Sequence, residues 1–298
     1  MINSGKLVGL TEKKHYNVII NSKKIADMNT LLTQKQILSY QQDGFLLVED
    51  FLNQEELSNW RQAVTEAIEQ RGGQKMPGSV VKIGEDDGIN KDSEYFSKVF
   101  DQMLNLWQTN NKVKQIMLNE KLGAMAAELA DWDGTRIWHD QALVKRPWAN
   151  PTSWHIDTPF WSFSDRRALS IWVALDDSTY QNGCLYFIPA SYRGTKLENP
   201  GIGKNMDTIF DSYPQFKNTK SVAVPMKAGS CSFHNGLTIH GAGANMTNGF
   251  RRAMTCAYMP DGAVFNGIQN ILSNEQVAKL KIGDLLNDDT QNPLIYKK

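Results

Sequence analysis

Two histidines and one aspartate are spaced so that they could bind one metal ion. His155 and Asp157 lie two residues apart, and on a strand or its extended edge such residues point to the same face. His240 follows on a later predicted strand, after the apolar residues Leu237 and Ile239. A β barrel can bring that strand beside the first one. Two imidazoles and one carboxylate would then bind the ion from one face and leave its opposite positions open.

This ligand set suits Fe(II), which in such a site must bind a co-substrate and O2 together. Zinc more often takes a tetrahedral site with one open position, so the ligands alone leave the identity of the metal open. A His-x-Asp pair also arises by chance in many sequences, and the alternative for His155 and Asp157 is a polar pair in a loop. Further residues therefore decide whether the site exists.

A positively charged residue follows the third candidate ligand. Arg251 stands eleven residues after His240, beyond a polar turn at 244–247. The returning strand would run antiparallel to the strand of His240, so Arg251 could face the same cavity. A guanidinium there can bind the far carboxylate of 2-oxoglutarate, whose keto acid end chelates iron. The alternative is an exposed arginine beside Arg252.

The other histidines and the aromatic residues nearby have competing interpretations. His139 and Asp140 are adjacent, so on a strand they point to opposite faces and cannot bind one ion together. His234 precedes His240 by six residues, and we interpret it as a packed histidine or one that supports a ligand. The aromatic residues near the first ligand pair could form either core or an apolar substrate wall: Trp148, Trp154, Phe160, Trp161 and Phe163.

Helices dominate the elements before the site. After a polar N-terminal arm over 1–32, a helical part is expected over 33–130, with capping boxes that begin at Thr33 and Asn53. Two further helices are predicted within 96–130, broken near Thr109 and around Asn119. The regular spacing of apolar residues in the second of these four helices indicates that one face packs against the rest of the protein.

Short strands follow from about residue 135 to 260, separated by Gly, Pro, Asn and Asp. Together with the preceding helices they predict a single domain over 33–298, mainly β with flanking α, built on an antiparallel barrel or jelly roll. The polar segment 194–220 is a candidate lid, and the tail 261–298 is expected to hold one helix and to lie at the periphery. The predicted strands are 45–48, 136–145, 168–175, 184–188, 221–224, 230–234, 238–240 and 252–259.

Composition excludes several classes of protein. Of the 298 residues, 32 are Lys or Arg and 32 are Asp or Glu, so there is no electrostatic case for a nucleic-acid partner. The N-terminus lacks the apolar region of a signal peptide, and no stretch has the apolar length of a membrane span. The cysteines are three in number and form no CxxC pair, so we expect thiols in a reducing cytoplasm. No oligomeric state is predicted.

Several stretches occur in the order of the motifs of a known family. They lie between residues 43 and 259 and read DGFLLVEDFL, QALVKRP, WHIDTPFW, LSIWVALDD, NGCLYFIPASYR and HGAGANMTNGFRRA. In these stretches the chain resembles the phytanoyl-CoA dioxygenase family of Fe(II)/2-oxoglutarate-dependent oxygenases. The resemblance implies a double-stranded β-helix core, a cupin-like jelly roll, with metal ligands at His155, Asp157 and His240 and with Arg251 on the co-substrate carboxylate.

The resemblance also implies parts of the co-substrate pocket. Gln141 and Trp172 match positions that line the 2-oxoglutarate pocket in relatives, although the first could be a structural hydrogen-bonding residue and the second a core residue. Relatives commonly carry a hydroxyl residue where this chain has Ala242, which removes one expected hydrogen bond to the co-substrate. Some relatives use an upstream lysine, for which Lys82 and Lys98 are the candidates here.

We therefore expect a non-haem Fe(II)/2-oxoglutarate-dependent dioxygenase that hydroxylates a small molecule with O2 and releases succinate and CO2. Halogenating relatives replace the carboxylate ligand with Gly or Ala, so Asp157 favours hydroxylation; desaturation, epimerisation and ring formation remain open. The alternatives are a metal-dependent cupin-type isomerase or hydrolase that does not use 2-oxoglutarate, and a binding protein without turnover. An anionic substrate could meet Lys145, Arg146, Arg166 and Arg167, although charged residues near a rim are usually solvated.

Overall fold

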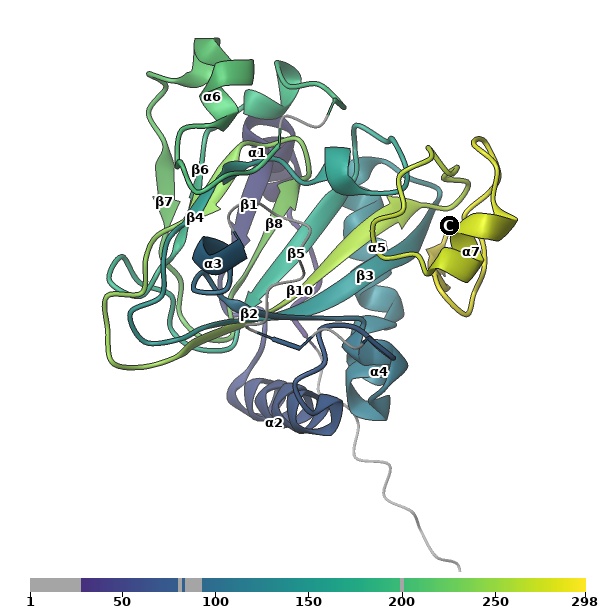
Figure 1. Ribbon diagram of the computed structural model, residues 1–298, viewed down its shortest axis with the longest axis horizontal. Helices are drawn as coiled ribbons and strands as arrows, with labels where there is room; N and C mark the ends of the chain where they lie inside the picture. The colour runs from purple at the N-terminus through teal and green to yellow at the C-terminus, as the bar shows by residue number, and fades with distance from the viewer. Residues whose placement is uncertain (1–27, 80–81, 84–92, 199–200) are drawn as a thin grey trace, which may run out of the picture.

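Two β-sheets form the centre of the molecule in a computed structural model that describes residues 28–79, 82–83, 93–198 and 201–298 (Figure 1). Most of the predicted arm over 1–32 lies outside the described residues. The larger sheet has the order β1-β8-β5-β10-β3-β11, and β2 also pairs with β3; the smaller sheet has the order β4-β9-β6-β7. The pairs are antiparallel, as in the expected jelly roll, so the double-stranded β-helix prediction is confirmed.

The strands of the larger sheet are β1 (Phe45–Val48), β2 (Asp101–Leu104), β3 (Gly134–Lys145), β5 (Leu169–Ala174), β8 (Cys231–Asn235), β10 (Arg251–Pro260) and β11 (Leu294–Lys297). Those of the smaller sheet are β4 (Thr152–His155), β6 (Leu185–Phe187), β7 (Val222–Val224) and β9 (His240–Ala242). The α-helices are α1 (Gln34–Asp43), α2 (Gln54–Arg71), α3 (Ser93–Phe96), α4 (Asn111–Met117), α5 (Glu120–Ala130), α6 (Ile209–Ser212) and α7 (Asn274–Lys279). Short 3₁₀ helices are η1 (Leu106–Gln108), η2 (Thr158–Phe160), η3 (Ser191–Arg193) and η4 (Pro214–Phe216).

The first two helices begin and end as the sequence predicts. Thr33 caps α1 and Asn53 caps α2, each within a capping box that satisfies backbone donors at both ends of the motif. Gly44 and Gly72 end these helices in the left-handed conformation, at φ of 79° and 57°, which glycine adopts without steric cost. Among the described residues, no helix is both long and apolar enough to cross a membrane.

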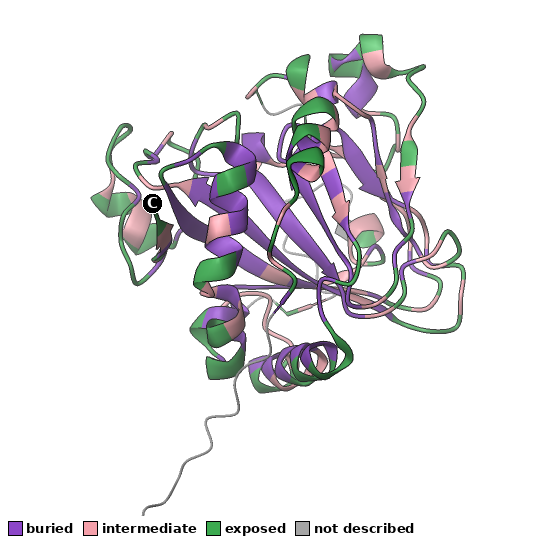
Figure 2. Cartoon of the chain, turned by 180° about the vertical axis from the view of Figure 1, so that it is seen from behind, coloured by how far each residue is buried: buried purple, intermediate pink, exposed green. Residues whose placement is uncertain are grey.

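The outer face of the larger sheet carries the main hydrophobic core. Helices α1 and α5 lie over this face, α2 and α4 pack below the lower end of the sheet, and buried residues of all four belong to the core (Figure 2). Trp60 on α2, Trp138 on β3 and Phe233 on β8 belong to this core, and none is more than 4% exposed. Burying such side chains stabilises the fold by about 1.5–3 kcal/mol each, so this packing stabilises the larger sheet from its outer side.

The segment before α4 was predicted as helix, and this was wrong. Residues 101–104 form β2, which pairs with β3, and η1 follows. The carboxylate of Asp140 on β3 accepts hydrogen bonds from the backbone nitrogens of Leu106 and Trp107, at 2.7 and 2.9 Å. This contact between distant residues decides the local structure, and helical periodicity could not reveal it.

The tail 261–298 is not peripheral, contrary to expectation. It holds the one predicted helix, α7, but it also ends in β11, which adds a strand to the larger sheet beside β3. Asn292 donates to the carbonyls of Ile137 and Trp138, and Arg136 forms ion pairs with Asp261 and Asp289. The C-terminal strand is therefore part of the folded domain.

Close packing of β11 on α5 predicts that Gly123→Ala destabilises the protein. A Cβ at Gly123 would lie 2.7 Å from Cβ of Tyr296 and 2.9 Å from Cγ1 of Ile295, so β11 must shift. Overpacking typically costs about 1–3 kcal/mol, more than the helix propensity that alanine adds. In urea unfolding, Gly123→Ala should lower the free energy of unfolding of the full chain. It should raise the free energy of unfolding of a chain that ends at Pro293 and therefore lacks β11. A gain in both chains would contradict the packing.

Candidate metal centre and co-substrate pocket

The structure brings His155, Asp157 and His240 together. One ligand atom from each residue lies within 4.8 Å of the others, the spacing of a possible metal site. His155 ends β4 and His240 begins β9, and the two are direct partners across that strand pair, with ring centroids 4.1 Å apart. The sequence expected the two strands to be neighbours, and the sheet pairing makes them so.

The position of Asp157 comes from a turn and not from the strand. β4 ends at His155, and Asp157 has helical backbone angles at the start of η2. Its backbone nitrogen donates to the carbonyl of Gly236 at 2.6 Å, and its carbonyl accepts from Phe160. The alternation of side chains along a strand is therefore not what aligns Asp157 with His155. Instead, η2 and the turn before β9 place its carboxylate beside both imidazoles.

Backbone hydrogen bonds orient the two imidazole rings. Nδ1 of His155 lies 2.8 Å from the carbonyl of Ser153, and Nδ1 of His240 lies 2.9 Å from the carbonyl of Thr238. Because a carbonyl oxygen only accepts, each Nδ1 carries the proton and each Nε2 keeps a lone pair. Both Nε2 atoms face Asp157, at 3.5 and 3.8 Å from its carboxylate oxygens. Metal-binding histidines are commonly held in this tautomer.

The electrostatics of the cluster favour an ionised carboxylate. Burial alone would raise the pKa of Asp157, but the electrostatic interaction with His240 and the contacts with His155 and His234 lower it well below its usual value. Burial and the nearby His155 lower the pKa of His240 well below its usual value, so this ring is neutral at pH 7. Burial also lowers the pKa of His155, but Asp157 outweighs it, and the net pKa is raised. An anionic carboxylate and neutral imidazoles are the forms that bind metals.

The remaining buried histidines stand close to the same carboxylate. His234 on β8 lies 3.3 Å from Oδ2 of Asp157 through its Nε2 atom. His139 is buried on β3, where burial lowers its pKa to about 4 although Asp157 raises it. Asp140, next to His139, points the other way and caps η1, so the prediction that this adjacent pair cannot bind one ion together is confirmed.

Arg251 lies at the other end of the interior, as the first residue of β10. β10 pairs with β3 and β5 and not with β9, so Arg251 belongs to the larger sheet. It is 2% exposed, and its Nε and Nη1 atoms have no hydrogen-bond partner among the described residues. Burial lowers its pKa to about 10, which leaves it charged at pH 7. Asp176 interacts with this guanidinium electrostatically, but the two nitrogens without partners among the described residues remain free to bind an anion.

Gln141 and Trp172 lie on the row of inward-facing residues between these two ends. Trp172 and Gln141 are both direct strand partners of Thr255, and Trp172 also pairs with Ser232. The guanidinium of Arg251 stands 5.1 Å from the centroid of the Trp172 ring, a cation–π contact. Ser232 is fully buried, and its hydroxyl has no partner among the described residues. Ser232 was not predicted from the sequence, although the alternation of side chains along β8 places it on the same face of the strand as His234.

The lysine nearest this pocket is not one of the two candidates. Lys98 is exposed and pairs with Glu94, and Lys82 is exposed as well. Lys145, the direct strand partner of Arg251, is fully buried and donates to the carbonyls of Val99 and Asn150. Burial, together with the charge of Arg251, lowers its pKa to about 6. The expectation that Lys145 is a solvated rim residue was therefore wrong.

Arg252, the neighbour of Arg251, faces the opposite side of β10. Its Nε and Nη2 atoms bind both oxygens of Asp176 at 2.9 and 2.8 Å, and its backbone nitrogen donates to the same carboxylate. This pair links the start of β10 to Asp176, which follows β5. The two adjacent arginines thus have different surroundings, one bound to an acid and one not.

Asp176→Asn should lower the free energy of unfolding by about 1–3 kcal/mol at pH 7, the usual worth of hydrogen bonds to a charged group. Burial raises the pKa of Asp176, but Arg252 outweighs it and the net pKa is lowered. Its contribution is therefore complete above the unfolded pKa, near 4, and is lost as pH falls below it. Urea unfolding should show a smaller difference in the free energy of unfolding between the unsubstituted protein and Asp176→Asn at pH 3.5 than at pH 7. A gap independent of pH would contradict the pairing.

The candidate lid packs directly on the ligand strands. Ile209, Phe210 and Tyr213 in and beside α6 form a buried apolar cluster with Ile156 and Ile239, each adjacent in sequence to a candidate ligand. In Figure 1, α6 lies above the ends of β4 and β6. The segment therefore covers the smaller sheet at the metal-ligand end, where access to the interior can be controlled.

The aromatic residues near the ligand pair do not form one wall. Trp161 and Phe163 stack and belong to the outer core, with exposures of 4% and 1%. Trp154 packs edge-on against Tyr186 and contacts Phe210 of α6. Trp148 is 70% exposed. The core interpretation is right for Trp161 and Phe163, and Trp154 connects the ligand strand with the candidate lid.

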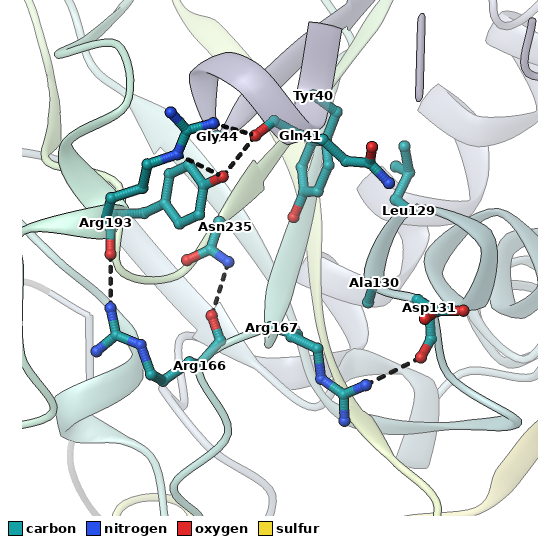
Figure 3. Close-up of a pocket in the computed structure, with 11 residues that line it drawn as sticks. Tyr40, Gln41, Gly44, Leu129, Ala130, Asp131, Arg166, Arg167, Arg193 and Asn235 are labelled. Carbon is teal, nitrogen blue, oxygen red and sulfur yellow. Dashed lines mark hydrogen bonds between the residues drawn. The ribbon is translucent and has the colours of Figure 1, made fainter. Parts of the chain in front are cut away.

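A surface pocket of about 470 Å³ lies between α1, the end of α5 and η3, and none of the three candidate ligands lines it (Figure 3). Arg166 donates to the carbonyls of Thr195 and Tyr192, and Arg193 donates to that of Gln41. These arginines fasten the start of the candidate lid to its surroundings. The pocket is thus separate from the metal cluster, and Arg166 has backbone partners of its own.

Comparisons with known proteins identify the family and the fold. Residues 40–253 match the family model described as phytanoyl-CoA dioxygenase (PhyH). A Caenorhabditis elegans phytanoyl-CoA dioxygenase domain-containing protein 1 homolog is 22% identical over 84% of this chain and 98% of its own length. The carbocyclase SnoK is similar in structure, with a TM-score of 0.72, 23% identity and coverage of 90% and 98% of the two chains. The epimerase SnoN, solved with Fe3+, alpha ketoglutarate and nogalamycin RO, has a TM-score of 0.66, 25% identity and coverage of 88% and 97%.

Proposed function

The chain belongs to the phytanoyl-CoA dioxygenase family of Fe(II)/2-oxoglutarate-dependent oxygenases, and from this premise we propose that it hydroxylates a small molecule at an iron bound by His155, Asp157 and His240. Arg251 binds the far carboxylate of 2-oxoglutarate, and Gln141 and Trp172 line the co-substrate pocket. O2 is the second co-substrate. Succinate and CO2 are released with the hydroxylated product.

One observation carries this proposal: the protein combines a candidate metal-binding cluster with a buried guanidinium, two of whose nitrogens lack a hydrogen-bond partner among the described residues. The cluster offers two imidazoles and a carboxylate, the donor set of non-haem Fe(II) oxygenases. Arg251 offers buried donors that lack partners among the described residues. A molecule with a chelating keto acid and a distal carboxylate satisfies both ends at once. These residues therefore fit iron and 2-oxoglutarate together.

Bound Fe(II) and 2-oxoglutarate supply the oxidising chemistry, in which oxidative decarboxylation activates O2. The chain orients these groups and excludes water. Backbone carbonyls fix the two imidazoles, Arg251 fixes the far carboxylate, and Trp172 packs against that guanidinium. The candidate lid 194–220 covers the end at which the substrate enters. Such fixed positions lower the barrier because the reacting groups need no reorganisation.

Asp157 supports hydroxylation over halogenation, since halogenating relatives have no carboxylate at this position. The runner-up, a cupin-type isomerase or hydrolase with the same ligands, leaves the buried charge of Arg251 without a role. A binding protein without turnover would leave the complete set of metal ligands without a role. Desaturation, epimerisation or ring formation would use the same site and differ only in the product.

We also propose a small-molecule substrate and a cytoplasmic location. The substrate proposal is supported by the structural relative SnoN, which was solved with nogalamycin RO. The three cysteines Cys184, Cys231 and Cys256 are buried free thiols, as a reducing compartment maintains. The domain is proposed to span 33–298, with the lid, the helices and the C-terminal strand as parts of one unit.

The direct test is turnover with a panel of small molecules under 18O2. We expect succinate to form in amounts equal to a product that carries one atom of labelled oxygen. A product that has lost two hydrogens would instead indicate desaturation or ring formation at this site. A product with an inverted stereocentre would indicate epimerisation. Turnover of a substrate without consumption of 2-oxoglutarate would contradict the proposal and favour the isomerase or hydrolase.

A further inference from the structure

A third imidazole contacts the carboxylate of the candidate metal site. His234 lies on β8, where alternation puts its neighbour Phe233 in the outer core and its own ring in the interior. Its Nε2 atom is 3.3 Å from Oδ2 of Asp157, and the residue is only 4% exposed. This contact is shorter than the 3.5 and 3.8 Å that separate Asp157 from His155 and His240.

His234 nevertheless differs from the two candidate ligands in how its ring is held. His155 and His240 each direct Nδ1 to the carbonyl of the residue two positions before, which leaves Nε2 as a metal donor. Nδ1 of His234 has no such partner among the described residues. Its ring is positioned by packing, with centroids 4.5 Å from that of His240 and 5.5 Å from that of Phe187. The backbone therefore does not fix its tautomer in the ligand form.

The chemistry of the carboxylate decides the tautomer instead. An ionised carboxylate only accepts hydrogen bonds, so Nε2 of His234 must carry the proton that joins it to Oδ2. A histidine that donates through Nε2 cannot offer that atom to a metal. His234 then uses one lone pair of Oδ2, while Oδ1, which lies 3.5 Å from Nε2 of His155, keeps both of its lone pairs for the ion.

We propose that His234 is a positioning residue that makes Asp157 a ligand through one oxygen only. Without this donor, Oδ2 is free to turn toward the ion and to use a position that the co-substrate and O2 require. The proposal rests on the proposed function, because it assumes that Asp157 binds a metal. It adds a role to a residue that the resemblance did not assign.

Two substitutions separate donation from packing. His234→Leu removes the donor and keeps an apolar side chain beside Phe187, whereas His234→Gln keeps an N–H that can reach Oδ2. His139→Leu is the matched control, since His139 is a similarly buried histidine of the larger sheet without a hydrogen bond to Asp157. The metal probe is Co(II), which is stable in air and whose visible spectrum reports its coordination. Anaerobic Fe(II) with 2-oxoglutarate gives a second readout through its charge-transfer band.

We expect His234→Leu to weaken Co(II) binding about 10–100-fold, the usual effect of removing a partner of a metal ligand, and to change the Co(II) spectrum. His234→Gln should restore most of the affinity and the original spectrum, and His139→Leu should retain both. Unchanged binding and spectrum in His234→Leu would overturn the proposal, and so would a His234→Gln variant no better than His234→Leu. If the unsubstituted protein binds neither Co(II) nor Fe(II), the proposed function itself fails, which is a distinct result.

Discussion

Asp157→Ala abolishes 2-oxoglutarate-dependent turnover and leaves the protein folded: this is the first result that we expect. The substitution removes one of three proposed ligands and the only carboxylate among them. Loss of a mere partner of a ligand costs about 10–100-fold in metal affinity, so loss of the ligand itself should exceed that range. Succinate formation and Fe(II) content after anaerobic gel filtration should both fall to background.

The matched control is Asp165→Ala, which removes an aspartate that pairs with Arg167 and lies outside the cluster. It should retain metal and turnover. Removal of Asp157 also relieves the burial of a charged group, so thermal unfolding of the metal-free protein should not shift to a much lower temperature. Full activity in Asp157→Ala would falsify the metal assignment, and unfolding of that variant would call for Asp157→Asn in its place.

Arg251→Met should raise the apparent requirement for 2-oxoglutarate by about two orders of magnitude. Removing one member of a buried, hydrogen-bonded charge pair costs roughly 2–5 kcal/mol, and each 1.4 kcal/mol is about tenfold. The affinity for Fe(II) should change little, because no proposed ligand is touched. Methionine keeps much of the volume, and the loss of an uncompensated buried charge should leave the metal-free protein at least as stable.

Arg252→Met is the control for this variant. Arg252 is adjacent in sequence but binds Asp176 on the other side of β10, so its loss should lower stability while the requirement for 2-oxoglutarate stays within a few fold. A comparison of KM for 2-oxoglutarate, the dissociation constant for Fe(II) and the free energy of unfolding separates the two residues. Equal weakening of iron and 2-oxoglutarate binding in Arg251→Met would indicate misfolding and would remove the basis for assigning the carboxylate to Arg251.

Local patterns predicted the elements that local interactions determine. The capping boxes at Thr33 and Asn53 satisfy their own helix ends, so the sequence was sufficient to place α1 and α2. His155 and His240 could be joined because the motifs imply a jelly roll, and the pairing of β4 with β9 follows from that topology. Each of these features depends on neighbours in sequence or on the fold as a whole.

The features that the sequence did not reveal depend on contacts between distant residues. β2 forms because β3 offers it an edge and because Asp140 caps η1. Lys145 looked like a rim residue, yet the carbonyls of Val99 and Asn150 bind it inside the molecule. Asp157 reaches the cluster through a turn that Gly236 holds. In each case the partner lies in another element, where periodicity and spacing carry no information.

The anaerobic spectrum tests the central claim most directly. Fe(II) and 2-oxoglutarate are added to the protein without O2, and the visible metal-to-ligand charge-transfer band is recorded. We expect a band that appears only when both Fe(II) and 2-oxoglutarate are present and that decays with formation of succinate when O2 is admitted. The band should be absent in Asp157→Ala, and in Arg251→Met it should require a far higher concentration of 2-oxoglutarate. A folded protein that shows no band at saturating Fe(II) and 2-oxoglutarate would contradict the account.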